Sequence, residues 1–133
     1  MKKIITSSNI IVLFLSLCVT ALLPLTTYAS SVNGRYIKGS GAAIVFEVTV
    51  GKPAPASLIV EQSLSQKNKI KEASPQPQKI SASGKVKWLV KNIKPGKKQF
   101  TIKLASPLQG SVKGVVRYRD PSSGKFLEMN VTP

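Results

Sequence analysis

The stretch that decides the fold is Lys85–Lys91, which reads Lys-Val-Lys-Trp-Leu-Val-Lys. Its apolar side chains fall on one side and its lysines on the other, with Val86, Trp88 and Val90 set against Lys85, Lys87 and Lys91. Successive side chains of a β-strand point to opposite faces of the sheet, so this alternation predicts a strand with one buried and one charged face. We therefore expect Trp88 to pack in a hydrophobic core rather than to stack against a bound sugar.

The same alternation recurs on both sides of this stretch. It is found in residues 43–50, 57–64, 97–104, 111–119 and 125–131. Proline and glycine separate these segments, as in Pro95-Gly96, where a type II turn fits, and in Asp120–Gly124, where a hairpin connection fits. Residues 66–73 suit either a helical turn or a short strand. The pattern predicts an all-β protein, a single antiparallel β-sandwich of about six to eight strands.

The N-terminal residues read as a targeting signal. Lys2 and Lys3 precede an apolar core, and Thr27-Tyr28-Ala29 offers small residues at the positions that signal peptidase requires. Residues 1–29 are therefore predicted to be a cleaved signal peptide, although the apolar core is also nearly long enough for a retained membrane anchor. Residues 30–41 are predicted to be a flexible arm or a weakly paired first strand, and residues 42–133 the sandwich domain. The expected location is the periplasm, the cell surface or the extracellular space.

Composition excludes several chemistries. The 133 residues hold 20 Lys+Arg, 5 Asp+Glu, one Cys and no His, which gives a formal charge of +15. A histidine base, a Ser-His-Asp triad and a histidine-ligated metal are therefore impossible. Cleavage after Ala29 removes two lysines and the cysteine, so a charge of +13 remains on a chain without disulfides.

The acidic residues give little support for catalysis. A glycosidase needs two carboxylates across a cleft, and Glu47 and Glu61 lie on predicted neighbouring strands. The simpler interpretation is that both are solvated residues of an outer face that pair with lysines. No acids are spaced as in a calcium loop, and no Ser-x-x-Lys motif has the required context. We predict no enzyme activity and no catalytic, cofactor or metal site.

Several short motifs indicate a family of folds. They are Ala56–Gln62, Gly84–Trp88, Ile93–Gly96 followed by Phe100, Gly114–Tyr118, and Asp120-Pro121. Together they resemble the immunoglobulin-like modules of bacterial surface and secreted proteins, of the conserved-repeat or cohesin-like type. The resemblance covers most of the chain after the signal peptide. It implies an immunoglobulin-like sandwich and a setting at the cell surface, without implying a ligand.

The lysines are the most informative candidates for a site. The predicted anion-binding residues, which share the polar sides of their strands, are Lys85, Lys87, Lys91, Lys103, Lys113, Arg117 and Arg119. The sequence has 17 Lys and 3 Arg. Lysine is a flexible point charge, whereas arginine provides the planar fork that reads bases and phosphates, so sequence-specific nucleic-acid recognition is not expected.

Two functions from different classes follow. The first is an exported binding module in low-specificity electrostatic contact with an anionic polysaccharide, a lipid headgroup at the membrane surface, or an acidic protein. The second is an assembly subunit of a surface filament or secretion complex that adds a strand to a neighbour. A lysine-rich face that only keeps a small sandwich soluble explains the charge equally well.

Overall fold

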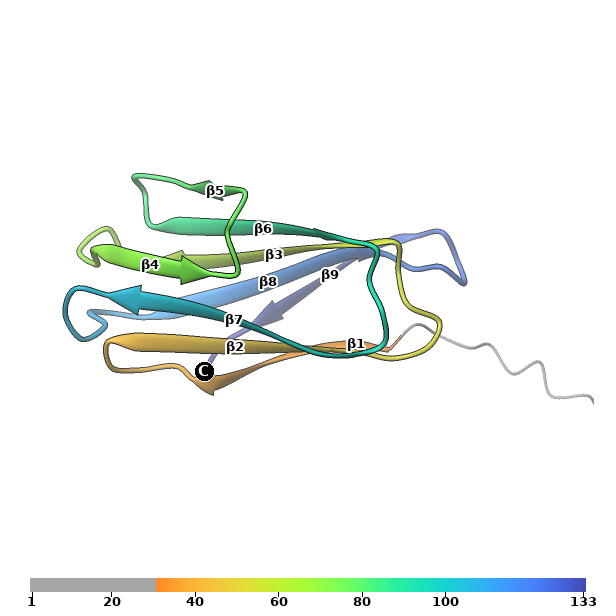
Figure 1. Ribbon diagram of the computed structural model, residues 1–133, viewed down its shortest axis with the longest axis horizontal. Helices are drawn as coiled ribbons and strands as arrows, with labels where there is room; N and C mark the ends of the chain where they lie inside the picture. Colours follow the sequence, from red (N-terminus) through yellow and green to blue (C-terminus); the bar gives the residue numbers. More distant parts are fainter. Residues whose placement is uncertain (1–30) are drawn as a thin grey trace, which may run out of the picture.

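The computed structural model describes residues 31–133, and the regular secondary structure in this range is entirely β-strand (Figure 1). Nine strands are present: β1 (Val32–Lys38), β2 (Ala43–Val50), β3 (Ser57–Leu64), β4 (Ile70–Ser74), β5 (Lys79–Ile80), β6 (Lys85–Lys91), β7 (Gly96–Leu104), β8 (Val112–Arg119) and β9 (Phe126–Val131). The predicted signal peptide lies outside the described residues and stays a prediction. Within residues 31–133, no helix is long and apolar enough to cross a membrane.

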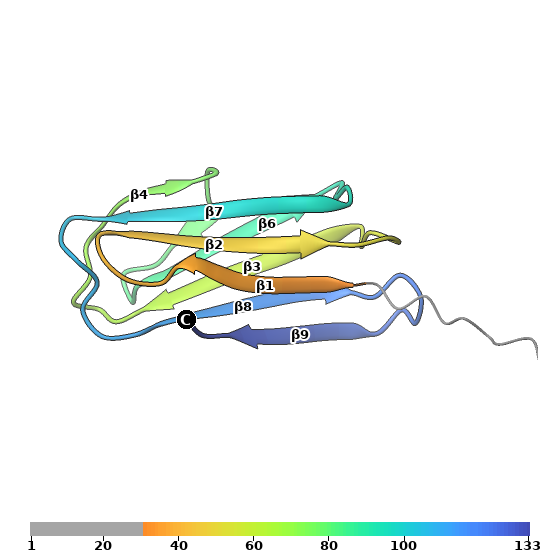
Figure 2. The same cartoon turned by 90° about the horizontal axis from the view of Figure 1, so that it is seen from below.

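The strands form two antiparallel sheets that pack face to face (Figure 2). The strand order is β1-β2-β7-β4 in the four-stranded sheet and β5-β6-β3-β8-β9 in the five-stranded sheet. The apolar sides of the alternating strands meet between the layers, and Phe46, Leu58, Val60, Val86 and Val116 are completely buried there. The predicted all-β class and the two antiparallel layers are therefore confirmed.

The N-terminal segment resolves the two alternatives left open for residues 30–41, a flexible arm or a weakly paired first strand. It forms a strand, since β1 pairs along β2 as an edge strand of the four-stranded sheet, and the domain therefore begins before the predicted residue 42. Tyr36 packs edge-on against Phe46, with ring centroids 5.0 Å apart. Gly34 is required by this packing, because a Cβ there would lie 2.8 Å from Phe46 Cζ. A glycine that suggests flexibility in the sequence thus marks a close approach between side chains, and the domain includes β1.

Residues 31–133 form nine strands where about six to eight were expected, because β1, β4 and the two-residue β5 are added to the six alternating segments. The ambiguous segment 66–73 contributes to β4, which pairs with β7 through an irregularity between Ile70 and Glu72. The hairpin prediction for Asp120–Gly124 is confirmed, since this segment connects β8 to β9 and Gly124 has φ 69°. Gly96 has the positive φ that was expected, 131°, but this value is well above the roughly +80° of a type II turn, and the residue is already the first of β7. Both values lie in the region that favours glycine.

Trp88 lies in the core, as predicted. Its side chain is 2% exposed and its ring centroid is 5.2 Å from that of Phe100 on the opposite sheet. The indole Nε1 donates a hydrogen bond of 2.7 Å to the carbonyl oxygen of Pro75, in the segment that crosses from β4 to β5. Trp88 therefore joins the two sheets and holds the crossing segment.

A polar bridge also links the sheets inside the core. Tyr36 Oη on β1 donates a hydrogen bond to Gln62 Oε1 on β3, and Gln62 is 1% exposed. Burial raises the pKa of the Tyr36 hydroxyl, so it remains a protonated donor. Gly114, which lies opposite Gln62 in the β3–β8 pairing, leaves the space that this bridge occupies.

Candidate anion-binding surface

The outer face of the five-stranded sheet carries most of the predicted cations. β3 lies at its centre and is flanked by β6 and β8. Ser63 of β3 is paired with Lys85 on one side and with Lys113 on the other. Because directly paired residues point to the same face, this register places lysines from two separated segments on one surface.

Five lysines of this face, hereafter the lysine face, form no salt bridge with a described carboxylate: Lys79, Lys85, Lys87, Lys91 and Lys113. Glu61 lies directly opposite Lys87 in the β3–β6 register, but its salt bridge is with Arg117. Lys79 was missed by the sequence analysis. It enters the face because the short β5 pairs it with Lys87. A two-residue strand has no alternation to detect, so no signal in the sequence placed it there.

Lys103 was predicted to belong to this site, and that prediction is wrong. It lies on β7, in the four-stranded sheet, and its Nζ is 2.8 Å from Glu72 Oε2 of β4. The prediction assumed that consecutive polar sides belong to one face. The chain instead crosses from one sheet to the other between β6 and β7, so the polar side of β7 faces away from the lysine face.

The two predicted arginines lie on the five-stranded sheet, as expected, but other groups of the protein already bind them. Arg117 lies between two carboxylates, with its Nη1 3.2 Å from Glu61 Oε2 and its Nε 2.7 Å from Glu128 Oε2. The hydrogen bond to Glu128 is the main reason that the pKa of Arg117 is raised. Arg119 donates a hydrogen bond of 3.2 Å to the carbonyl oxygen of Gly124. Arg117 is thus largely neutralised, and both arginines also have local structural contacts.

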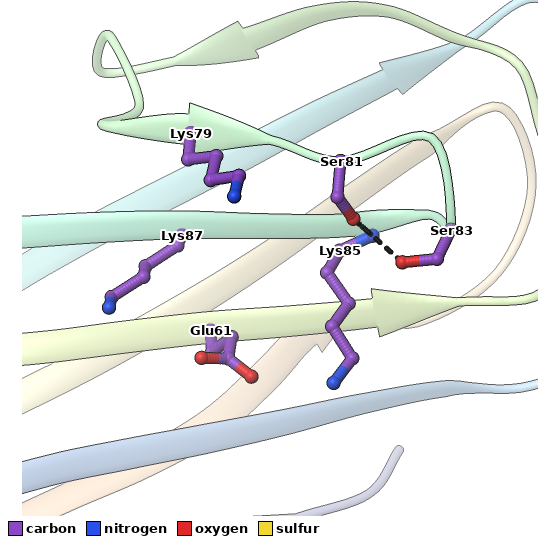
Figure 3. Close-up of a pocket in the computed structure, with 6 residues that line it drawn as sticks. All are labelled: Glu61, Lys79, Ser81, Ser83, Lys85 and Lys87. Atoms are coloured by element: carbon purple, nitrogen blue, oxygen red, sulfur yellow. Dashed lines mark hydrogen bonds between the residues drawn. The ribbon is translucent and has the colours of Figure 1, made fainter.

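An open hollow of about 320 Å³ lies at one end of the lysine face (Figure 3). Lys79, Lys85 and Lys87 line it together with Glu61, and the hydroxyls of Ser81 and Ser83 complete its rim. The two serine hydroxyl oxygens are 2.8 Å apart, and Ser81 Oγ accepts a hydrogen bond of 3.2 Å from the backbone N–H of Lys85. The hollow therefore combines three flexible cations with hydroxyl groups that are able to bind oxygen-rich anions.

The two carboxylates considered for glycosidase chemistry do not face each other. Glu47 lies on β2 and Glu61 on β3, and these strands belong to different sheets. Both side chains point away from the core, so the two carboxylates lie on opposite sides of the sandwich. The prediction that they occupy neighbouring strands is wrong, because consecutive strands of a sandwich often cross between its layers.

Glu47 is also not the solvated residue that was expected. Its side chain is 5% exposed and its Oε1 lies 2.8 Å from Arg35 Nη2 of β1. Gln99 Nε2 of β7 donates a hydrogen bond of 3.2 Å to Oε2, and Lys97 Nζ is 3.8 Å from Oε1. The hydrogen bond from Arg35 is the main cause of a lowered pKa for Glu47, followed by the bond from Gln99. Residues of the two neighbouring strands, β1 and β7, thus converge on one carboxylate of β2.

Replacing Glu47 with Gln should make stability less dependent on pH. A carboxyl whose pKa is lower in the folded protein stabilises it at pH values above the ordinary pKa of 4.5, and this contribution is lost as the pH falls through the folded value. Wild-type and Glu47→Gln proteins should therefore differ most near neutral pH and converge in acid. Urea unfolding at about pH 7 and about pH 3 measures this difference.

Glu72→Gln is the control for this prediction, because it breaks the exposed Glu72–Lys103 pair on the same sheet. Exposed pairs contribute little to stability, so its effect should be small. An equal loss of stability in the two variants at neutral pH would contradict the role given to Glu47.

The described part of the chain thus defines a class: a small, strongly basic, all-β protein of two antiparallel layers, with lysines on one face that form no salt bridge with a described carboxylate. Within residues 31–133, no group of three or more Cys, Asp or Glu side chains is arranged to hold a metal ion. No protein-family model matches the sequence, and neither a curated protein nor a solved structure matches it significantly.

Proposed function

We propose that this protein is an exported binding module of the cell envelope that contacts an anionic partner through its lysine face. The observation that carries the proposal is that five lysines share one side of one sheet and form no salt bridge with a described carboxylate, while all four described glutamates are engaged by other cations. Unpaired cations on a common face attract polyanions, and they release counterions when they bind.

The residue types favour contact of low specificity. The surface offers lysines and serine hydroxyls, and its two arginines are already engaged by Glu61, Glu128 and Gly124. Lysine ammonium groups adapt to many anion geometries, so an acidic polysaccharide, a lipid headgroup or an acidic protein each remains a suitable partner class. Export, predicted from residues 1–29, would place these classes within reach. No enzymatic activity is proposed.

We also propose that the fold is a variant of the immunoglobulin-like sandwich. Supporting this, the spatial orders β1-β2-β7-β4 and β5-β6-β3-β8-β9 match the orders A-B-E-D and C″-C′-C-F-G of variable-type immunoglobulin domains. The order in which the chain visits these positions differs in the middle. β3 takes the position of strand C, and the next three strands, β4, β5 and β6, take the positions of D, C″ and C′. Immunoglobulin domains visit these three positions in the reverse order, C′, C″ and D.

Charge reversal on the lysine face tests the binding function. The variant Lys85→Glu/Lys87→Glu/Lys113→Glu should lose affinity for a heparin oligosaccharide by about tenfold or more at moderate salt. Its plot of log affinity against log salt should also become shallower, by about one unit for each lysine that contacts the polymer. Titration calorimetry or fluorescence anisotropy over a range of salt concentrations gives both quantities.

The matched control is Lys52→Glu/Lys67→Glu/Lys94→Glu, which changes the net charge equally at three exposed loop positions outside the lysine face. This control should retain most of the affinity and the salt slope. If both variants lost the same affinity, net charge alone would account for binding and the proposed surface would be rejected.

For the alternative role, assembly by strand addition, the structure restricts which strand could take part. Residues 32–38 already form β1 of their own sheet, so this segment is not a free donor strand. Strand addition would instead need an open edge of one of the two sheets, and β9 provides the most suitable one.

A further inference from the structure

The four edge strands of the sandwich are not equally protected. β5 has only two residues, and both β1 and β4 are interrupted by an irregular register. Short strands, bulges, lysines and prolines are the usual features that prevent one sheet edge from pairing with another. β9 has none of them: its six residues, Phe-Leu-Glu-Met-Asn-Val, pair with β8 in continuous register.

The open side of β9 is accessible and apolar. Figure 2 shows β9 at the margin of the five-stranded sheet, and within residues 31–133 it pairs with β8 alone. Phe126 is 60% exposed and Leu127 is 38% exposed, although both belong to a regular strand. The backbone N–H of Asp120 donates to the carbonyl oxygen of Lys125, so by alternation the main-chain groups of Phe126, Glu128 and Asn130 point to the open side.

We propose that β9 pairs with β9 of a second copy of this chain, antiparallel across a two-fold axis at Met129. Residues that are directly opposite share a face, so this register pairs Met129 with Met129 of the partner subunit and Leu127 with Val131 of the partner subunit. Glu128 lies opposite Asn130 of the partner subunit. Leu127, Met129 and Val131 all lie on the core side of β9, so the pairing covers apolar side chains on both copies.

Charge favours a second copy in this register. β9 is the edge strand without a lysine or arginine in a chain of +15, so it is the sheet edge at which two copies repel each other least. Shifting the axis to Glu128 would oppose two carboxylates, whereas the axis at Met129 places each carboxylate opposite a neutral amide. Glu128 also keeps its ion pair of 2.7 Å with Arg117 of its own copy.

The dimer would have one continuous sheet made of both five-stranded sheets. A two-fold axis perpendicular to this sheet keeps both lysine faces on the same side. A long polyanion could then contact both copies at once, and its apparent affinity would exceed that of either copy alone. The dimer itself requires no anion, so a failure of the proposed binding function would not exclude the dimer.

A cysteine at the axis tests the register. In the full chain with Cys18→Ser, the variant Met129→Cys should form a disulfide-linked dimer under mild oxidation. The Cβ atoms of residue 129 in the two subunits lie directly opposite each other in this register. Leu127→Cys is the matched control, since it lies on the same side of β9 and is at least as exposed, yet the register places its two copies four residues apart. We expect Met129→Cys to cross-link at least about tenfold faster.

Sedimentation equilibrium tests the dimer without a cross-link. Asn130→Pro removes one N–H from the open edge while leaving the β8–β9 hydrogen bonds in place, so it should weaken dimerisation by about tenfold or more. Circular dichroism checks that the variant is folded, and Asn130→Lys is a second variant that places a charge on the same edge. Added salt should strengthen the dimer by screening repulsion, whereas it should weaken heparin binding.

Three results would overturn the proposal. The first is a wild-type protein that stays monomeric at every concentration and salt level, even if β9 binds a strand of another protein. The second is equal cross-linking of Met129→Cys and Leu127→Cys. The third is a dimer that is unaffected by both Asn130→Pro and Asn130→Lys, because a different surface would then form it.

Discussion

Replacing Trp88 with alanine should destabilise the folded protein by about 3–5 kcal/mol. The side chain is 2% exposed and packs against Phe100 of the other sheet, so its removal leaves a cavity between the layers. The substitution also removes the hydrogen bond from Nε1 to the carbonyl oxygen of Pro75. A domain of this size has a total stability of about 5–15 kcal/mol, so the variant should lose a large part of it. Urea unfolding followed by circular dichroism measures the loss.

Trp88→Phe separates the packing from the hydrogen bond. Phenylalanine retains an aromatic ring but has no N–H, so this variant should lose much less stability than Trp88→Ala. Part of its loss, about 0.5–1.5 kcal/mol, should come from the missing hydrogen bond. If alanine and phenylalanine cost the same, the hydrogen bond rather than core packing would be the main contribution of Trp88.

Gly114→Ala should cost about 1–3 kcal/mol, a large effect for the addition of one methyl group. A Cβ at this position would lie 2.9 Å from Gln62 Nε2, 3.0 Å from Tyr36 Oη and 3.1 Å from Phe46 Cε2. These atoms belong to the polar bridge and to a ring that is completely buried, so they have little freedom to move. Thermal or urea unfolding monitors the effect.

A double-mutant cycle attributes this cost to the polar bridge. Gln62→Ala removes the amide nearest to the new methyl group, so Gly114→Ala should cost clearly less in the Gln62→Ala background. Gln62→Ala alone is destabilising too, because it leaves the buried hydroxyl of Tyr36 without its acceptor. Additive costs would mean that the contact with Gln62 is not what excludes a side chain at residue 114.

The candidate site was only partly predictable. Lys85, Lys87, Lys91 and Lys113 lie on one face, as expected, because the period-two pattern determines which side of each strand is polar. Lys103 follows the same pattern on the other sheet, and Lys79 joins the face through a strand too short to show a pattern. Local alternation gives the polar side of a strand but carries no information about which strand is its neighbour.

The acidic residues illustrate the same limit. Glu47 alternates with apolar residues like any exposed residue, yet Arg35, Lys97 and Gln99 cover it from the two neighbouring strands. Gln62 occupies an apolar position in its strand and is buried, since Tyr36, which is distant in the sequence, supplies its hydrogen bond. The burial of a polar residue depends on its neighbours across the sheet, which no local pattern describes.

By itself, the sequence determined the all-β class, the inward position of Trp88, the positive φ of Gly96 and Gly124, and the lysine-bearing sides of the strands. These features depend on side-chain period and backbone conformation, which are local properties. Only the tertiary structure decided that residues 32–38 form β1, that Lys103 leaves the lysine face while Lys79 joins it, and that β9 remains an open edge. These features depend on contacts between residues far apart in the chain, and such contacts are set when the two sheets pack together.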